Sequence, residues 1–126
     1  MNTDKLLYSE LTYRIRGVIF KVYNTLGFGH KEIVYHKALG IEFKKQGILY
    51  KDEVPIPVYY EKEKVGTYQP DFVIEDKVLI EVKALPFITK AAEVQMVYYL
   101  RGTRYNLGLL VNFGSKKLEI RRKVWG

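Results

Sequence analysis

Asp71, Glu81 and Lys83 are charged residues that interrupt two otherwise apolar runs in the middle of the chain. They lie within residues 69–85, QPDFVIEDKVLIEVKAL, which are rich in the β-branched residues typical of strands. Side chains two positions apart in a strand share a face, so Glu81 and Lys83 are expected to point to the same side. The spacing therefore predicts charged groups on one face of an apolar strand.

The position of Asp71 depends on the register of the hairpin that the two runs form. A three-residue loop pairs Ile74 with Val78 and places Asp71 directly opposite Glu81, whereas a two-residue loop sends the two acids to opposite faces. A functional cluster requires the three-residue loop.

These residue types are suited to metal-dependent hydrolysis of a phosphodiester. Two carboxylates a few ångströms apart repel each other unless a proton or cation lies between them, and hard oxygen ligands suit Mg²⁺ or Mn²⁺. A lysine beside such an ion can activate a water molecule or stabilise the charge on a phosphoryl group. The same spacing also fits an Asp at a strand entry followed by a solvent-facing Glu–Lys pair, and these residues alone do not decide between the two interpretations.

Composition favours one soluble globular domain over residues 1–126, with 48% hydrophobic and 28% charged residues. The absence of cysteine excludes disulfides and thiolate metal sites, and two histidines cannot alone build a zinc site. No segment reaches the roughly 18 apolar residues that span a bilayer, so we expect a cytoplasmic protein. The net charge of +7 suits a nucleic-acid partner, although a well-solvated basic surface also explains it.

Helical periodicity and capping residues predict three helices. Ser9 is the expected N-cap of the first helix, Gly47 the C′ residue of the second, and Thr89 and Gly102 the start and stop of the third. The expected ranges are residues 9–26, 30–46 and 89–101.

The remaining apolar segments predict strands. A β-rich segment that contains Pro55 and Pro57 suits an edge strand, and the polar residues 61–66 suit a turn. The hairpin of Asp71 and Glu81 turns at Glu75 and Asp76, and a closing hairpin turns at Gly114 and Ser115. The strand ranges are expected at residues 48–60, 68–74, 77–83, 105–113 and 116–125. The predicted order is ααβββαββ, an α/β fold with a central mixed sheet flanked by helices.

The segment QPDFVIEDKVLIEVKAL resembles the PD-(D/E)XK motif of the restriction-endonuclease-like nucleases, with Pro70 and Asp71 as its first half and Glu81, Val82 and Lys83 as its second. Residues 29–39, GHKEIVYHKAL, are similar to the signature of the GxxExxY proteins, a small branch of that superfamily. The blocks VPIPVYY, AEVQMVYYLR and LGLLVNFGS resemble later parts of the same family, so the resemblance extends from about Leu11 to Ile120.

This resemblance implies a restriction-endonuclease-like core and a nuclease that depends on Mg²⁺ or Mn²⁺. Asp71 and Glu81 then hold the metal with the Val82 carbonyl, Glu32 is the acid that a helix contributes to the metal site, and Lys83 activates water. Glu32 also fits a helix cap that answers the helix dipole.

Gln95 and Tyr99 resemble a Gln-x-x-x-Tyr motif that lines the site in some branches, with Gln95 counted as catalytic and Tyr99 as substrate-binding. Their alternative is a helix face with Tyr99 packed and Gln95 solvated. His36 lies four residues after Glu32, but the sequence favours a surface or packing role for it, and Tyr68 is not assigned to the site.

The predicted function is hydrolysis of nucleic acid phosphodiester bonds, with DNA favoured over RNA and a homodimer compatible with the small domain. The first alternative is a nucleic-acid-binding module that keeps the fold without catalysis. The second is a structural subunit that acts through a protein partner.

Overall fold

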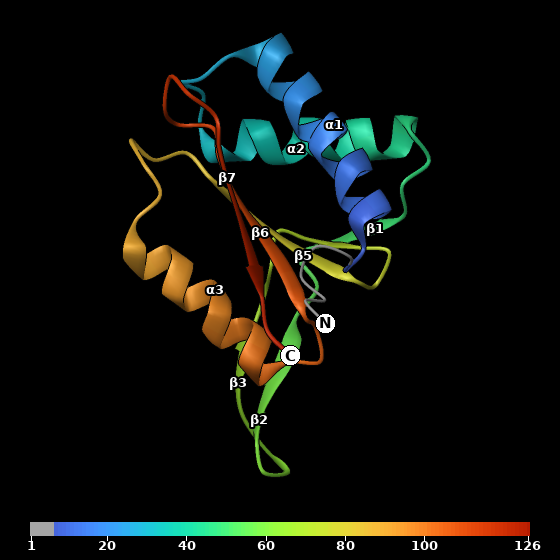
Figure 1. Cartoon of the computed structure of the whole chain (residues 1–126), viewed down its shortest axis with the longest axis vertical. Coiled ribbons are helices and arrows are strands. Elements are labelled where there is room, and N and C mark those ends of the chain that lie inside the picture. The colour runs from blue at the N-terminus through green and yellow to red at the C-terminus, as the bar shows by residue number, and fades with distance from the viewer. Residues whose placement is uncertain (1–6) are drawn as a thin grey trace.

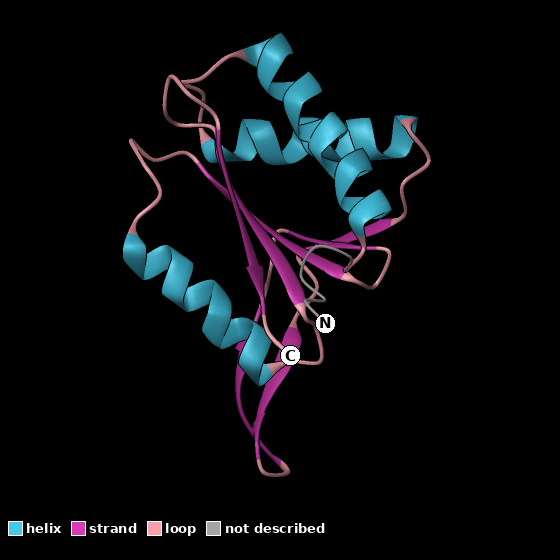
Figure 2. Cartoon of the chain, viewed as in Figure 1, coloured by secondary structure: helices cyan, strands magenta, loops and turns pink. Residues whose placement is uncertain are grey.

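The computed structural model describes residues 7–126 and places helices on both sides of a twisted sheet (Figure 1, Figure 2). Helices α1 and α2 lie across one side of this sheet, and α3 runs along the other. The chain runs through α1 (Ser9–Leu26), α2 (Glu32–Lys45), β1 (Tyr50–Asp52), β2 (Ile56–Tyr60), β3 (Glu63–Tyr68), β4 (Phe72–Ile74), β5 (Val78–Lys83), α3 (Lys90–Gly102), β6 (Leu107–Asn112) and β7 (Glu119–Val124).

The main sheet has five strands in the order β1-β4-β5-β6-β7. Strands β5 and β6 are parallel and the other neighbours are antiparallel, so the predicted α/β fold with a central mixed sheet is confirmed. The β4–β5 hairpin lies inside this sheet, as expected.

The strand order differs from the prediction before α3, where five strands replace the expected three. The apolar segment expected as one strand divides because Glu53 adopts a positive φ of 53° and Pro55 follows it. The expected turn at residues 61–66 is mostly strand β3, because the chain already reverses at Glu61, whose φ is 55°. Strands β2 and β3 therefore form a separate two-stranded ribbon, called here the arm.

The helix boundaries follow the sequence signals except at two positions. Ser9 is not the N-cap of α1: Tyr8 occupies that position in a left-handed conformation without a side-chain cap. Gly102 is the last residue of α3 rather than its stop. Gly47 has the positive φ expected after α2, and the Thr89 hydroxyl accepts a hydrogen bond from the backbone three residues further on, as predicted.

Two hydrophobic clusters pack on opposite faces of the sheet. Side chains of α1 and α2 cover the face that includes Phe72, Ile80 and Val82. Side chains of α3 cover the other face, which includes Val73 and Leu79. Because side chains alternate along β5, Glu81 and Lys83 follow Leu79 on the α3 side.

The hairpin register is the one that a functional cluster requires. Ile74 pairs with Val78 across the loop of residues 75–77, and Phe72 pairs with Ile80. Asp71 therefore reaches the level of Glu81, one position beyond the paired residues of β4. The strand expected at 68–74 is in fact the end of β3 and, after a break, the short β4.

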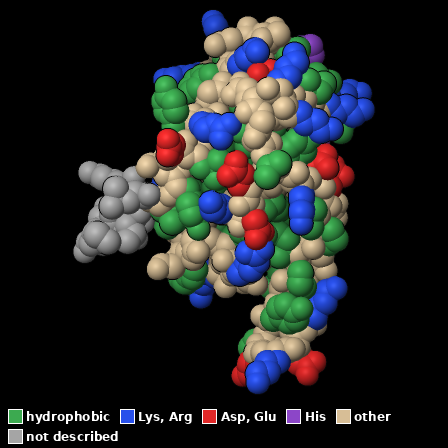
Figure 3. Space-filling model, turned by 90° about the vertical axis from the view of Figure 1, so that its right-hand side faces the viewer, with side chains coloured by type: hydrophobic (Ala, Val, Ile, Leu, Met, Phe, Trp, Pro, Cys, Tyr) green, Lys and Arg blue, Asp and Glu red, His purple; other side chains and the backbone are tan. Residues whose placement is uncertain are grey.

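The arm projects from the body of the molecule, and exposed Tyr59, Tyr60 and Val65 lie along it (Figure 1, Figure 3). Tyr68 at its base is buried instead. Among residues 7–126, no helix has the length and apolar character needed to cross a membrane.

Candidate active site

The carboxylate of Asp71 is held through both of its oxygens. Its Oδ2 accepts a hydrogen bond of 2.7 Å from the Val82 backbone N–H. Its Oδ1 lies 2.9 Å from Nδ1 of His36, which donates to it because an ionised carboxylate can only accept. The side chain of Asp71 thus links the entry of β4, the end of β5 and helix α2.

Glu81 lies beside Asp71 with only 16% of its side chain exposed. Its Oε1 accepts a 2.9 Å hydrogen bond from the Tyr68 hydroxyl, and its Oε2 lies 3.8 Å from Nζ of Lys83. Burial and then the negative charge of Asp71 raise the pKa of Glu81 to about 7, against the opposing effects of Tyr68 and Lys83. The two acids therefore form a pair that resists carrying two negative charges.

Tyr68 connects Glu81 to helix α3. Its ring stacks on that of Tyr99, with centroids 3.6 Å apart and an interplanar angle of 13°. Burial and then the charge of Glu81 raise the pKa of the Tyr68 hydroxyl, which stays protonated and donates to the carboxylate. Tyr99 thus meets the site through Tyr68, whereas the Gln95 side chain is exposed and makes no hydrogen bond with any residue in the described chain.

Glu32 opens α2 on the side of the acid pair. Burial and then the charge of Asp71 raise the pKa of Glu32, while Lys83 and His36 act in the opposite direction. Its side chain therefore lies within electrostatic reach of the acid pair and Lys83. The first turn of α2 has no side-chain cap, so Glu32 is not a capping residue, but as the acid of that turn it still answers the helix dipole.

The tyrosine that follows Glu32 in the predicted signature is part of the core. The Tyr35 hydroxyl donates a 2.6 Å hydrogen bond to the Gly27 carbonyl, and its ring stacks on Phe113 at 4.3 Å. It thereby ties the start of α2 to the end of α1, which sets where Glu32 lies.

His36 contacts the acid pair, although the sequence favoured a surface or packing role for it. A surface role is wrong, because only 7% of its side chain is exposed. A packing role is correct but incomplete: the ring stacks on Phe72 at 4.4 Å and also reaches Asp71. Its position four residues after Glu32 was the available signal, since residues at this spacing share a helix face.

Tyr68 was also left out of the predicted site, because a tyrosine at the end of a β-rich run is more often a packing residue. Only the path of the arm brings its hydroxyl back to Glu81.

The donor set can be tested against the divalent ion that the sequence predicts. In the part of the chain that the structure describes, no group of three or more His, Asp or Glu side chains is arranged to hold a metal. Two carboxylates nevertheless converge at a half-buried position, where burial and then the charge of Asp71 raise the pKa of Glu81. Because Mg²⁺ keeps several water ligands and needs only one or two protein carboxylates, Asp71 and Glu81 fit such an ion.

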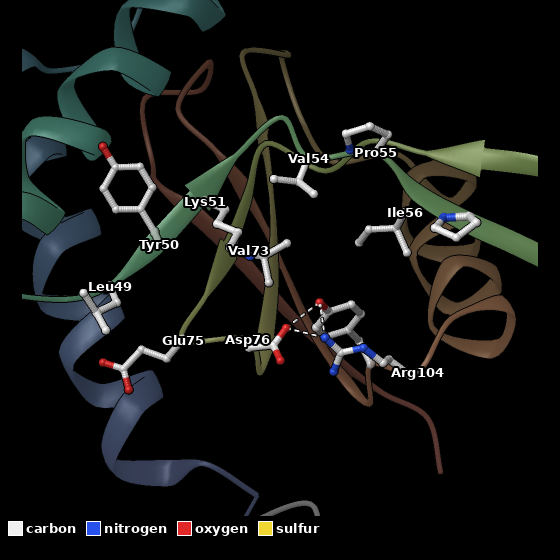
Figure 4. Close-up of a pocket in the computed structure, with 12 residues that line it drawn as sticks. Leu49, Tyr50, Lys51, Val54, Pro55, Ile56, Val73, Glu75, Asp76 and Arg104 are labelled. Carbon is white, nitrogen blue, oxygen red and sulfur yellow. Dashed lines mark hydrogen bonds and ion pairs between the residues drawn. The ribbon is translucent and has the colours of Figure 1, made fainter.

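A hollow of about 740 Å³ lies elsewhere, beside β1, the start of β2 and the segment after α3 (Figure 4). Asp76 on its wall is bonded to Arg104 and Tyr105. Asp76 belongs to the 75–77 loop, at the end of the β4–β5 hairpin opposite to Asp71. This hollow is thus separate from the acid pair.

Residues 9–123 match the family model of the PD-(D/E)XK nuclease superfamily. The chain therefore belongs to this superfamily. No curated protein and no solved structure gives a significant match to the chain.

Proposed function

We propose that this protein is a Mg²⁺- or Mn²⁺-dependent nuclease that hydrolyses phosphodiester bonds, with its active site at Asp71, Glu81 and Lys83. The observation that carries the proposal is the half-buried acid pair with an adjacent lysine, in a chain of a nuclease superfamily. A structural ion pair between Glu81 and Lys83 would not require Asp71, whose charge raises the pKa of Glu81.

The metal would be held by Asp71, Glu81 and the Val82 carbonyl, with Glu32 acting through a water molecule. A backbone contact supports this set of ligands, because the Val82 N–H already holds the Asp71 carboxylate in place. When bound, the ion supplies Lewis-acid polarisation of a phosphoryl oxygen and lowers the pKa of a coordinated water.

Lys83 is the group of this chain that would meet the reacting phosphate. Its Nζ lies 3.8 Å from Glu81 Oε2, with 26% of the side chain exposed. From this place it can orient the attacking water and stabilise the negative charge that develops on the phosphate oxygens. The reaction forms a bond from the water oxygen to phosphorus, breaks one phosphorus–oxygen ester bond and passes the water proton toward the leaving oxygen.

Gln95 and Tyr99 would position the substrate from α3, Tyr99 through its stack on Tyr68.

We further propose membership of the GxxExxY branch, a cytoplasmic location, DNA rather than RNA as substrate, a homodimer and one domain over residues 1–126. The net charge of +7 supports a nucleic-acid partner.

The second candidate is a nucleic-acid-binding module without catalysis. One observation favours it: the net charge of +7 supports binding to phosphates and does not require catalysis. Such a module would bind nucleic acid in the presence of EDTA and never cut it.

The test is cleavage of single- and double-stranded DNA and RNA with Mg²⁺ or Mn²⁺. We expect activity that EDTA abolishes, and losses of at least a hundredfold in Asp71→Asn and Lys83→Ala, which remove a metal ligand and the transition-state cation. Lys77→Ala is the matched control, because Lys77 is an exposed lysine at the opposite end of the same hairpin. Absence of cleavage with retained binding supports the second candidate instead.

A further inference from the structure

His36 lies between the proposed metal ligand and two further acids. Its Nδ1 is 2.9 Å from Asp71 Oδ1, while its Nε2 is 3.3 Å from Asp52 Oδ2 and 3.9 Å from Glu53 Oε1. Asp52 and Glu53 are more than half exposed, whereas His36 is buried. The imidazole is therefore a buried link between the site and an acidic rim.

The ring has little freedom to change its orientation. It stacks almost parallel to Phe72, at 4.4 Å and 21°, and Phe72 directly follows Asp71 in the chain. A contact between the Glu53 N–H and the Asp71 carbonyl, at 3.1 Å, joins the acidic rim to the same strand entry. Stacking and hydrogen bonding together hold the imidazole edge against one oxygen of Asp71.

The consequence for Asp71 is geometric. With Oδ2 bound to the Val82 N–H and Oδ1 bound to the His36 ring, rotation of the carboxylate would break a hydrogen bond at one oxygen or the other. Each oxygen keeps a second lone pair, so the carboxylate can still coordinate a cation in this orientation. Hydrogen bonds to ligating carboxylates are known to tune metal affinity about ten- to a hundredfold.

We propose that His36 is a positioning residue for the metal site: it donates to Asp71, fixes the orientation of that carboxylate and thereby sets the affinity for the divalent ion. Asp52 and Glu53 lie on the far side of the ring, within 3.3 Å and 3.9 Å of its Nε2. This inference rests on the proposed metal-dependent function and adds to it a residue outside the predicted ligand set.

The experiment measures Mn²⁺ binding to the full chain by calorimetry, separately from cleavage. His36→Phe keeps the stack on Phe72 but removes the donor, and we expect it to weaken Mn²⁺ binding about tenfold or more. His36→Asn places an amide donor near the former Nδ1 and should recover a large part of the lost affinity. His30→Phe is the matched control, since within residues 7–126 this exposed histidine contacts the Leu26 carbonyl and Tyr35, and the variant should bind Mn²⁺ like the wild type.

Thermal unfolding of each variant checks that the fold is retained. If His36→Phe is folded and binds Mn²⁺ as tightly as wild type, or if His36→Asn is no better than His36→Phe, the inference is overturned while the nuclease proposal stands. If the wild type binds no Mn²⁺ and cuts nothing, both fall together.

Discussion

At the scale of single residues, the main feature of the site is the Glu81 carboxyl, whose charged form the surrounding residues do not fully stabilise. Glu81 receives a hydrogen bond from Tyr68 and lies near Lys83, yet burial and the adjacent Asp71 still raise its pKa to about 7. A group used only for stability gains nothing from this arrangement. A divalent ion between the two carboxylates would favour their charged forms and remove the repulsion.

The raised pKa predicts how the stability of the metal-free protein depends on pH. Below about pH 7 the folded protein keeps a proton on Glu81, whereas the unfolded chain loses it near the ordinary value of 4.5. The folded state binds more protons between these values, so its free energy of unfolding should fall as the pH rises through this interval. Glu81→Gln keeps an acceptor for Tyr68 and should be more stable than wild type at pH 8 by on the order of 2–3 kcal/mol.

Urea unfolding in EDTA at pH 5 and pH 8 measures this difference. Glu63→Gln on the arm is the control, since that side chain is exposed and should change little at either pH. A Glu81→Gln variant with no greater stability than wild type at pH 8 would contradict the prediction.

At the scale of elements, the end of β5 is held in place by its parallel neighbour β6. Asn112, paired with Lys83 in the sheet, is fully buried and binds the Leu85 N–H at 2.8 Å and the Leu85 carbonyl at 3.0 Å. Gly114 makes this approach possible, because a Cβ there would lie 2.2 Å from the Leu85 nitrogen. The segment that follows Lys83 is thereby fastened to the β6–β7 turn.

Asn112→Ala should therefore loosen the end of the strand that carries Lys83. It leaves buried backbone groups without partners, and we expect a loss of about 2–3 kcal/mol in the free energy of unfolding. Hydrogen exchange of the Leu85 amide should become faster, which reports the local effect directly. Asn106→Ala, which removes an exposed amide bonded to the Trp125 carbonyl, is the control, and equal effects of the two substitutions would refute this role.

At the scale of the whole molecule, two pairs of exposed lysines differ in their position relative to the site. The exposed Lys116 and Lys117 lie in the β6–β7 turn. The Phe113 N–H of this turn bonds to the Lys83 carbonyl, so both lysines lie at the same end of the sheet as the site. Lys62 and Lys64 lie on the arm, far from that turn (Figure 1). A phosphate backbone that enters the site would meet the first pair.

Binding of DNA in EDTA, measured over a range of salt concentrations, tests this placement. The double variant Lys116→Ala, Lys117→Ala should bind more weakly and show a slope of log affinity against log salt that is smaller by about 2, because each lysine that contacts a phosphate contributes about one to the slope. The arm variant Lys62→Ala, Lys64→Ala should keep the wild-type slope. Equal slopes for wild type and the first variant would show that the turn does not contact the substrate.

The sequence by itself determined the features that depend on short-range interactions. Helical periodicity and the glycine at 47 located the helices, and alternation along β5 put Glu81 and Lys83 on one face. The predicted N-cap at Ser9 was wrong, because Tyr8 occupies the cap position in a left-handed conformation that no residue pattern indicates. Likewise, the number of strands was wrong where positive φ values at Glu53 and Glu61 turned the chain.

Only the tertiary structure decided which residues support the acids. Whether Asp71 faced Glu81 depended on a hairpin register that the sequence left open until the pairing of Ile74 with Val78 resolved it. His36 meets Asp71 across 35 positions in the chain, and the arm returns the Tyr68 hydroxyl to Glu81 across 13. Local propensity carries no information about such contacts, because they form only when helix α2 and the arm pack against the ends of β4 and β5.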